Sequence, residues 1–139
     1  MAVVEELIRV EEDGSISFGN DSLAEKTKKS DFEVNGDLYK VKTFSEITKL
    51  EKNEQFVYES VPGTVATRFQ AAEEGVSFYV EGAQDANITL ELEESTEYEV
   101  IIDEIKVSDM KTNLGGKLSI SVELGDGRKV AVRIVKKAQ

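Results

Sequence analysis

The chain has 139 residues, of which 40% are hydrophobic, and it carries a formal net charge of −11 with no Cys, His or Trp. This composition suits one packed domain and excludes disulfides, thiolate nucleophiles, imidazole bases and metal sites built from His or Cys. The negative charge makes nucleic acids and anionic membranes poor partners, because both are negatively charged themselves.

The first residues, MAVVEELIRVEEDG, lack the charged start, apolar run and cleavage site of a signal peptide. No segment approaches the roughly 20 consecutive apolar residues that a membrane helix needs. Together with the absence of cysteine, this predicts a cytoplasmic protein. If the chain is a fragment, an exported module is the alternative.

Most of the chain alternates apolar and polar residues with the period of two that is typical of half-buried strands. The predicted strands lie at about 3–10, 15–18, 32–34, 38–43, 56–60, 64–71, 76–81, 87–92, 98–102, 105–110, 117–124 and 129–136. Most of the sequence is therefore assigned to short extended segments.

Several segments between these strands have their own signals. The polar residues 22–32 predict a surface loop, and the apolar spacing in residues 44–52 would also fit a short helix. Asn35-Gly36 predicts a two-residue hairpin turn, because both residue types tolerate positive φ. Pro62-Gly63 fits the two central positions of a type II turn.

Strands separated by turns at this spacing predict an all-β fold, an antiparallel two-layer β-sandwich that is immunoglobulin-like or jelly-roll-like. We expect a single domain over residues 1–139, with about seven regular strands in residues 56–137. Residues 1–55 are less regular and predict an elaborated N-terminal segment of strands and a hairpin. This segment either forms a separate hairpin layer or supplies strands to one larger sandwich.

The inward positions of the predicted strands define an expected core. They include Leu7, Ile16, Phe18, Phe32, Val34, Leu38, Val41, Phe56, Phe69, Val76, Phe78, Val80, Ile88, Leu90, Val100, Ile102, Leu118, Ile120, Val122, Val130, Val132 and Ile134. Tyr58 and Tyr98 are expected to pack with one end in water. Tyr79 is out of phase with Phe78, so we expect an exposed ring that can stack on a sugar or anchor an interface.

Residues 98–124, YEVIIDEIKVSDMKTNLGGKLSISVEL, resemble a pattern in small immunoglobulin-like modules of bacterial glycan-active proteins. In those modules a Tyr-led strand turns into a Lys-Val strand, and a Thr-Asn-x-x-Gly turn precedes a Leu-Ser-x-Ser-Val strand. The pattern departs at Glu104, where such hairpins usually have Gly, and this departure argues against a tight turn at Asp103-Glu104. From EELIRVEEDGSISFGN onward, the chain also resembles short uncharacterised proteins of anaerobic Gram-positive bacteria, sometimes labelled endosialin-like. That label implies no established activity.

Acidic residues offer two candidate chemical sites. Glu91 and Glu93 share one strand face about 7 Å apart, a separation that suits glycoside hydrolysis by two carboxylates. The simpler interpretation of the two residues is that they lie on the solvated side of a strand.

A calcium site could draw on the acidic and amide oxygens of one N-terminal segment. Its ligands would be Glu11, Glu12, Asp13, Asn20 and Asp21. These residue types also stabilise ordinary turns, so the main expectation is that no cofactor is bound.

Charge is unevenly distributed in the second half. Residues 91–104 hold seven acidic residues and no basic one, and residues 128–137 hold five basic residues and no acidic one. Opposite charges stabilise neighbouring strands, so the two segments can be neighbours within one sheet. Alternatively, one segment lies on an edge and pairs across a subunit contact. The basic residues of such an interface would be Arg128, Lys129, Arg133, Lys136 and Lys137.

No motif converges on a reactive centre. The leading hypothesis is therefore a non-enzymatic structural or protein-interaction module, for which self-association is one form of partnership. The alternative is a carbohydrate-binding module, which the resemblance and Tyr79 favour. The third hypothesis is a carboxylate-based glycan hydrolase that uses Glu91.

Overall fold

The computed structural model describes residues 3–125 and 127–137, which form thirteen strands and no helix. The strands are β1 (Ile8–Val10), β2 (Ile16–Phe18), β3 (Thr27–Val34), β4 (Asp37–Phe44), β5 (Ile47–Lys52), β6 (Gln55–Val61), β7 (Val65–Ala72), β8 (Gly75–Glu81), β9 (Ala86–Glu91), β10 (Glu97–Ile102), β11 (Ile105–Lys111), β12 (Lys117–Val122) and β13 (Val130–Lys136). Within the described residues, nothing forms a helix long and apolar enough to cross a bilayer.

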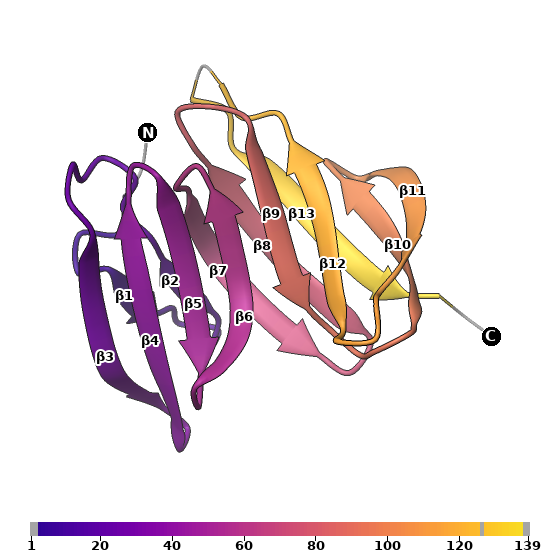
Figure 1. Cartoon of the computed structure of the whole chain (residues 1–139), viewed down its shortest axis with the longest axis horizontal. Helices are drawn as coiled ribbons and strands as arrows, with labels where there is room; N and C mark the ends of the chain where they lie inside the picture. Colours follow the sequence, from indigo (N-terminus) through magenta and orange to yellow (C-terminus); the bar gives the residue numbers. More distant parts are fainter. Residues whose placement is uncertain (1–2, 126, 138–139) are drawn as a thin grey trace.

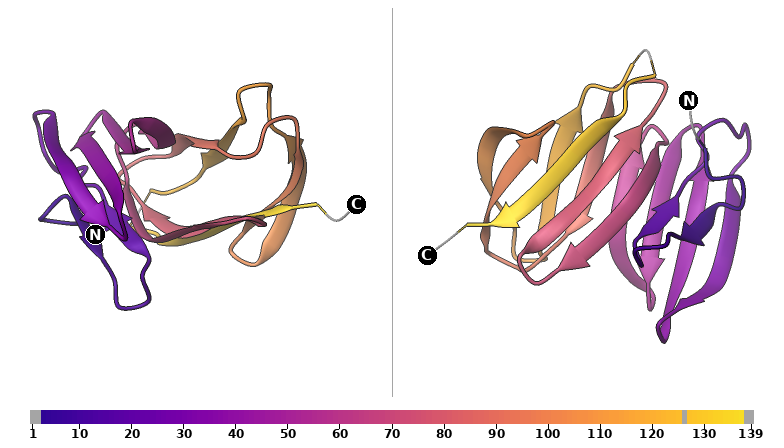
Figure 2. Two further views of the ribbon diagram at one scale, coloured as in Figure 1. Left: turned by 90° about the horizontal axis from the view of Figure 1, so that it is seen from below. Right: turned by 180° about the vertical axis from the view of Figure 1, so that it is seen from behind.

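The strands form two antiparallel sheets (Figure 1). The seven-stranded sheet has the order β1-β2-β7-β8-β13-β10-β11, and the six-stranded sheet has the order β12-β9-β6-β5-β4-β3. Seen from the side, they make two facing layers (Figure 2). The predicted all-β sandwich is confirmed.

The N-terminal segment is built into both layers. β2 pairs with β7 in the seven-stranded sheet, and β5 pairs with β6 in the six-stranded sheet. Residues 1–55 therefore supply strands to both sheets of the sandwich, and they do not form a layer of their own.

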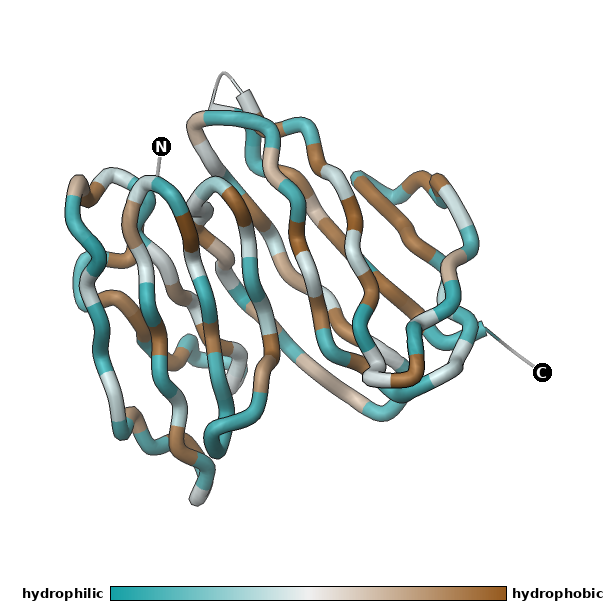
Figure 3. Tube along the Cα trace, viewed as in Figure 1, coloured by the Kyte–Doolittle hydropathy of each residue, from teal (hydrophilic) through white to brown (hydrophobic). Residues whose placement is uncertain are grey.

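The core lies between the two sheets, and hydrophobic and hydrophilic residues alternate along β9 and β12 (Figure 3). Its buried members are Ile8, Ile16, Phe18, Val41, Leu50, Tyr58, Ala66, Phe69, Val76, Phe78, Val80, Ala86, Ile88, Leu90, Tyr98, Val100, Leu118, Ile120, Val122, Leu124, Val130, Val132 and Ile134. Tyr58 packs edge-on against Phe18 and Phe78, with ring centroids 5.1 and 5.6 Å apart. Such aromatic pairs add about 0.5–1.5 kcal/mol each to the stabilisation from burial.

Two predicted core residues lie elsewhere. Leu38 lies three residues before the buried Val41, and side chains an odd number of residues apart in a strand point to opposite faces. Leu38 therefore lies on the outer face of β4 and is 46% exposed. Phe56 is only half-buried, because a register irregularity between β5 and β6 turns its ring away from the core face that Tyr58 occupies.

Tyr58 and Tyr98 are buried completely, which contradicts the expectation of one wet end. Their exposed fractions are 0% and 2%. The Tyr58 hydroxyl lies 2.7 Å from Thr64 Oγ1, and the Tyr98 hydroxyl accepts a hydrogen bond of 3.1 Å from the Glu93 backbone N–H. These partners satisfy both hydroxyls inside the protein, so neither needs water. Burial raises the pKa of Tyr58.

Three element predictions are wrong. Residues 47–52 form a strand rather than a helix, because pairing with β4 and β6 on both sides overrides the local apolar spacing. The predicted loop at 22–32 contains the start of β3 at Thr27. The predicted strand at 3–10 is reduced to Ile8–Val10, because Leu7 has a φ of 74° that an extended strand does not allow.

The turns depart from expectation in two places. Asn35 and Gly36 have φ of 50° and 86°, as the predicted hairpin requires. Gly63 lacks the positive φ of a type II turn; glycine is needed there because a Cβ would lie 2.0 Å from the Phe44 carbonyl oxygen. Asp103 and Glu104 do form a tight turn, with φ of 51° and 70°, and Asp103 Oδ1 accepts a 3.0 Å hydrogen bond from the Ala131 N–H.

Candidate functional site

The outer face of the seven-stranded sheet carries a shallow cavity of about 210 Å³. Arg68, Tyr79, Ile101, Glu104 and Arg133 contribute to its lining. A second hollow of about 350 Å³ adjoins it and shares Ser77 and Arg133. The two hollows together give this face a groove over β7, β8 and β13.

The pairing register explains the groove. On the outer face, Tyr79 stands opposite Ala131, and Arg133 stands opposite Ser77. Small side chains thus alternate with large ones, and the large ones form walls around a low floor. Further along, Gly75 stands opposite Val135 and lines the second hollow.

Tyr79 lies where the sequence predicts. Its side chain is 41% exposed, whereas Phe78 is 2% exposed in the core. Lys129 Nζ lies 5.0 Å from the centroid of the Tyr79 ring, close enough for a cation–π contact. Tyr79 is thus held beside a positive charge at the rim of the groove.

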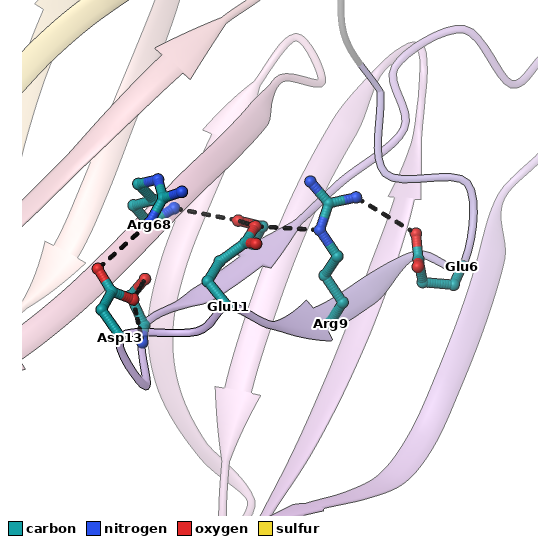
Figure 4. A network of polar contacts seen from close by, with 7 residues as sticks. Glu6, Arg9, Glu11, Asp13 and Arg68 are labelled. Atoms are coloured by element: carbon teal, nitrogen blue, oxygen red, sulfur yellow. Dashed lines mark hydrogen bonds and ion pairs between the residues drawn. The ribbon is translucent and has the colours of Figure 1, made fainter.

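Arg68 belongs to the groove, although no local sequence pattern singles it out. A β-bulge in β7 places Arg68 at a φ of 52° and brings its side chain to the outer face. Its guanidinium lies 3.3 Å from Asp13 Oδ2, and its backbone N–H donates to Ser17 Oγ. These two contacts hold the β1–β2 hairpin against the wall of the groove (Figure 4).

The five predicted calcium ligands are not brought together. Glu11 accepts hydrogen bonds from Arg9 and Ser17, and Asp13 accepts them from Ser15 and Arg68 (Figure 4). The hydrogen bond from Ser17, followed by that from Arg9, lowers the pKa of Glu11. The negative charge of Glu11 is therefore already stabilised by neighbours in the chain. Glu12 is exposed beside them. In residues 3–125 and 127–137, no three acidic side chains are grouped to hold a metal.

Asn20 and Asp21 lie apart from that hairpin and are buried. Asn20 Oδ1 accepts hydrogen bonds from the backbone N–H and the hydroxyl of Ser22, which is the local turn bonding that its residue type favours. Neither carboxylate oxygen of Asp21 has a hydrogen-bond partner within the described part of the chain. Burial raises the pKa of Asp21.

Glu91 and Glu93, the two candidate hydrolytic carboxylates, form ion pairs with different lysines. Glu91 Oε1 lies 3.5 Å from Lys117 Nζ on the neighbouring strand β12. Glu93 pairs with Lys136 on β13, in the opposite sheet. Both acids therefore make surface ion pairs, which is the simpler interpretation of their spacing.

The acidic and basic segments are neighbours within one sheet, because β10 pairs with β13. Three of the five predicted interface residues neutralise acids of the same chain. Arg128 pairs with Asp103, Lys136 with Glu93, and Lys137 with Glu97 and Asp109. Lys129 lies over Tyr79, and Arg133 lines the groove without an ion pair to any residue that the structure describes.

A second surface lies at the edge of the seven-stranded sheet. β11 is the last strand of that sheet and pairs only with β10 within the described residues. Six of its seven residues are exposed, and Ile105 and Val107 are 66% and 55% exposed. An edge of this kind presents a row of unpaired N–H and C=O groups that can accept another strand.

A register shift in β11 decides which side chains share a face. Lys106 stands opposite Ile101 and Asp109 opposite Glu99, and the shift between them leaves Val107 as an extra residue. Lys106 and Asp109 therefore project from the same face, where their side chains lie 3.0 Å apart. Simple alternation over three residues would have put them on opposite faces.

Comparison with family models, with curated proteins and with solved structures finds no match to this chain.

Proposed function

We propose that the chain is a non-enzymatic interaction module that associates with a second copy of itself through the free edge of β11. The single observation that carries this proposal is the exposure of β11, which displays Ile105 and Val107 to solvent. The other edge strands differ: β1 has three residues, and neither β3 nor β12 exposes a large hydrophobic side chain as β11 does. Short edges resist added strands.

The β11 edge is complementary to itself. In an antiparallel pair of two β11 strands centred on Ser108, the register that β11 keeps with β10 places Lys106 opposite Asp109 of the second copy. By the two-fold symmetry, Asp109 then lies opposite Lys106 of the second copy, and Ile105 lies opposite Met110. Opposite charges and apolar pairs at facing positions stabilise strand pairing by about 0.2–1 kcal/mol each.

Charge exchange tests this register by sedimentation equilibrium over a range of protein concentrations. The wild-type chain should show a monomer–dimer equilibrium. K106D places a carboxylate opposite Asp109 of the second copy, and D109K places an ammonium opposite Lys106, so each should raise the dissociation constant by about tenfold or more. An equimolar mixture of the two variants should form heterodimers, and the double variant K106D/D109K should dimerise again.

The matched control is Lys52→Asp, which removes an exposed lysine and its ion pair with Asp37 on the other sheet. It should leave the dimerisation constant unchanged. A wild-type chain that stays monomeric at all concentrations would overturn the self-association. If the wild-type chain dimerises but neither the mixture of K106D and D109K nor the double variant regains dimerisation, the β11 register would be overturned.

A carbohydrate-binding module is the second candidate, and the groove beside Tyr79 favours it. An exposed aromatic ring next to a hollow of about 210 Å³ suits the apolar face of a sugar, and Arg133 supplies hydrogen-bond donors. The partial resemblance of residues 98–124 to modules of glycan-active proteins agrees with this candidate. Retention on polysaccharide affinity gels that is lost in Tyr79→Ala and kept in Val61→Ala would support it. No retention on any polysaccharide would exclude it.

A further inference from the structure

A row of three lysines crosses the outer face of the six-stranded sheet. Lys28 on β3 stands directly opposite Lys42 on β4, and Lys42 stands directly opposite Lys49 on β5. We call these three residues the lysine row. Since neighbouring strands lie roughly 4.8 Å apart, its three Cα atoms span roughly 10 Å. Like charges at facing positions destabilise a sheet, so the row reduces the stability of the isolated chain.

The lysine row is a local reversal of charge in a chain with a net charge of −11. Lys40 adds a fourth positive charge on the same face of β4. Lys49 Nζ lies 3.6 Å from Glu51 Oε2, whereas Lys28, Lys40 and Lys42 have no ion pair among residues 3–125 and 127–137. Partial burial, followed by the surrounding lysines, lowers the pKa of Lys42. The positive charge of the row is therefore only partly compensated.

The face is hollowed at this point. Lys40, Lys42 and Lys49 line a small depression of about 30 Å³ together with Glu51. This volume is about the share of one water molecule in the liquid, so it admits one oxygen atom of a larger group. Each lysine ammonium carries three hydrogen-bond donors and no acceptor, which suits an anionic oxygen.

We propose that the lysine row binds an anionic polysaccharide, with its sulfate or carboxylate groups against Lys28, Lys42 and Lys49. On the same sheet face, Lys49 stands opposite Glu59 on β6. Beyond Glu59 the face continues over β9 and β12 with mainly neutral polar side chains. Thr89 and Ser119 are hydrogen-bonded there at 2.9 Å, and Asn87 and Ser121 at 2.7 Å. These hydroxyl and amide groups can hydrogen-bond sugar hydroxyls beyond the charged end. The proposal concerns the other sheet and does not depend on the β11 dimer.

A nucleic acid fits this surface less well. The two aromatic rings beside the lysine row are Phe44 and Phe56, and lysine ammonium groups lie over both. Lys26 Nζ is 6.0 Å from the Phe44 centroid, and Lys117 Nζ is 4.5 Å from the Phe56 centroid. Single strands depend on open aromatic faces for base stacking, and this face does not offer them.

Calorimetric titration of the full chain tests the proposal with matched probes. Dextran sulfate and neutral dextran share a backbone and differ in charge, polygalacturonate replaces sulfate with carboxylate, and oligo-dT provides the nucleic acid. Dextran sulfate or polygalacturonate should bind, and dextran should not. Neutralising the lysine row with K28Q/K42Q/K49Q should weaken binding by about tenfold or more at low salt.

The control triple variant R9Q/K52Q/K136Q makes the same change in net charge outside the row, the Tyr79 groove and β11, and it should bind within about twofold of wild type. Without a probe, K28Q/K42Q/K49Q should unfold at a higher temperature than wild type, because its like-charge repulsion is removed. No binding of either anionic polysaccharide would overturn the proposal, as would equal losses in the two triple variants. Tighter binding of oligo-dT than of both polysaccharides would overturn the assignment to a glycan.

Discussion

The hydroxyl oxygens of Tyr58 and Thr64 lie 2.7 Å apart between the two sheets, where both side chains are fully buried. Thr64 Oγ1 also lies 2.7 Å from Ser60 Oγ, and Thr48 Oγ1 donates to the Thr64 carbonyl oxygen at 2.8 Å. This buried polar cluster joins β5 and β6 to the segment that begins β7. A buried hydroxyl that loses its partner costs about 1–3 kcal/mol, so the cluster makes the packing of the two sheets specific.

We therefore expect Thr64→Val to lower the free energy of unfolding by about 1–3 kcal/mol, measured by urea denaturation, because the Tyr58 and Ser60 hydroxyls lose a partner. Tyr58→Phe removes one hydroxyl without leaving a large cavity and should cost about 1 kcal/mol. The double variant should lose less than the sum of the two single losses. Additive losses would mean that the two hydroxyls do not stabilise one another.

Replacing either of two turn residues by glycine should stabilise the fold. Glu54 and Glu104 have φ of 67° and 70°, a conformation that costs a residue with a Cβ about 1–2 kcal/mol. Glu54→Gly and Glu104→Gly should each raise the free energy of unfolding by about 1 kcal/mol. Glu46 lies in the corresponding turn between β4 and β5 without a positive φ, so Glu46→Gly should lower stability by about 0.5–1 kcal/mol. A stabilising Glu46→Gly would show that backbone conformation is not the cause.

Gly75 marks a close approach of β8 to β13. A Cβ at this position would lie 1.8 Å from the Ile134 carbonyl oxygen, so the two backbones would have to separate. We expect Gly75→Ala to lower the free energy of unfolding by about 3 kcal/mol. Gly36→Ala adds the same methyl in open space and should cost only the left-handed strain of about 1 kcal/mol. Similar losses in the two variants, measured by thermal unfolding, would contradict the close approach.

Asp21 should make stability depend on pH. Burial raises its pKa above the ordinary value of 3.8, and Glu81 acts in the same direction, so the folded chain holds this proton more tightly than the unfolded chain. The ionised carboxylate therefore destabilises the fold once the pH exceeds the folded pKa. Asp21→Asn should be more stable than wild type at pH 7, and the difference should shrink as the pH falls towards about 4.

Asp13 provides a control for that pH series, because its effect on stability should change with pH in the opposite direction. Hydrogen bonds from Ser15, chiefly from its side chain, lower the pKa of Asp13, so its ionised form stabilises the fold above pH 3.8. Asp13→Asn should be less stable than wild type at pH 7, with the difference lost at low pH. Thermal unfolding between pH 3 and 8 measures both variants. A constant difference for Asp21→Asn across that range would contradict the assigned pKa.

Part of the candidate site was predictable and part was not. The exposure of Tyr79 follows from alternation within β8, where Val76, Phe78 and Val80 face the core. Arg68 could not be found in this way, because a bulge in β7 determines the direction of its side chain. The alignment of Lys106 with Asp109 depends on the register shift opposite β10. Bulges leave no reliable mark in a local sequence pattern, because the pairing of two strands creates them.

The sequence by itself determined the two-layer β-sandwich and most of the core, because the inward and outward directions of a strand repeat every two residues and need no partner. It also placed the turn at Asn35-Gly36, since the preference for positive φ belongs to the residues themselves. Only the tertiary structure decided that β10 lies beside β13, that β11 is an edge, and that Lys28, Lys42 and Lys49 form one row. These relationships depend on which distant strands exchange hydrogen bonds and in which register, and no local pattern encodes that choice.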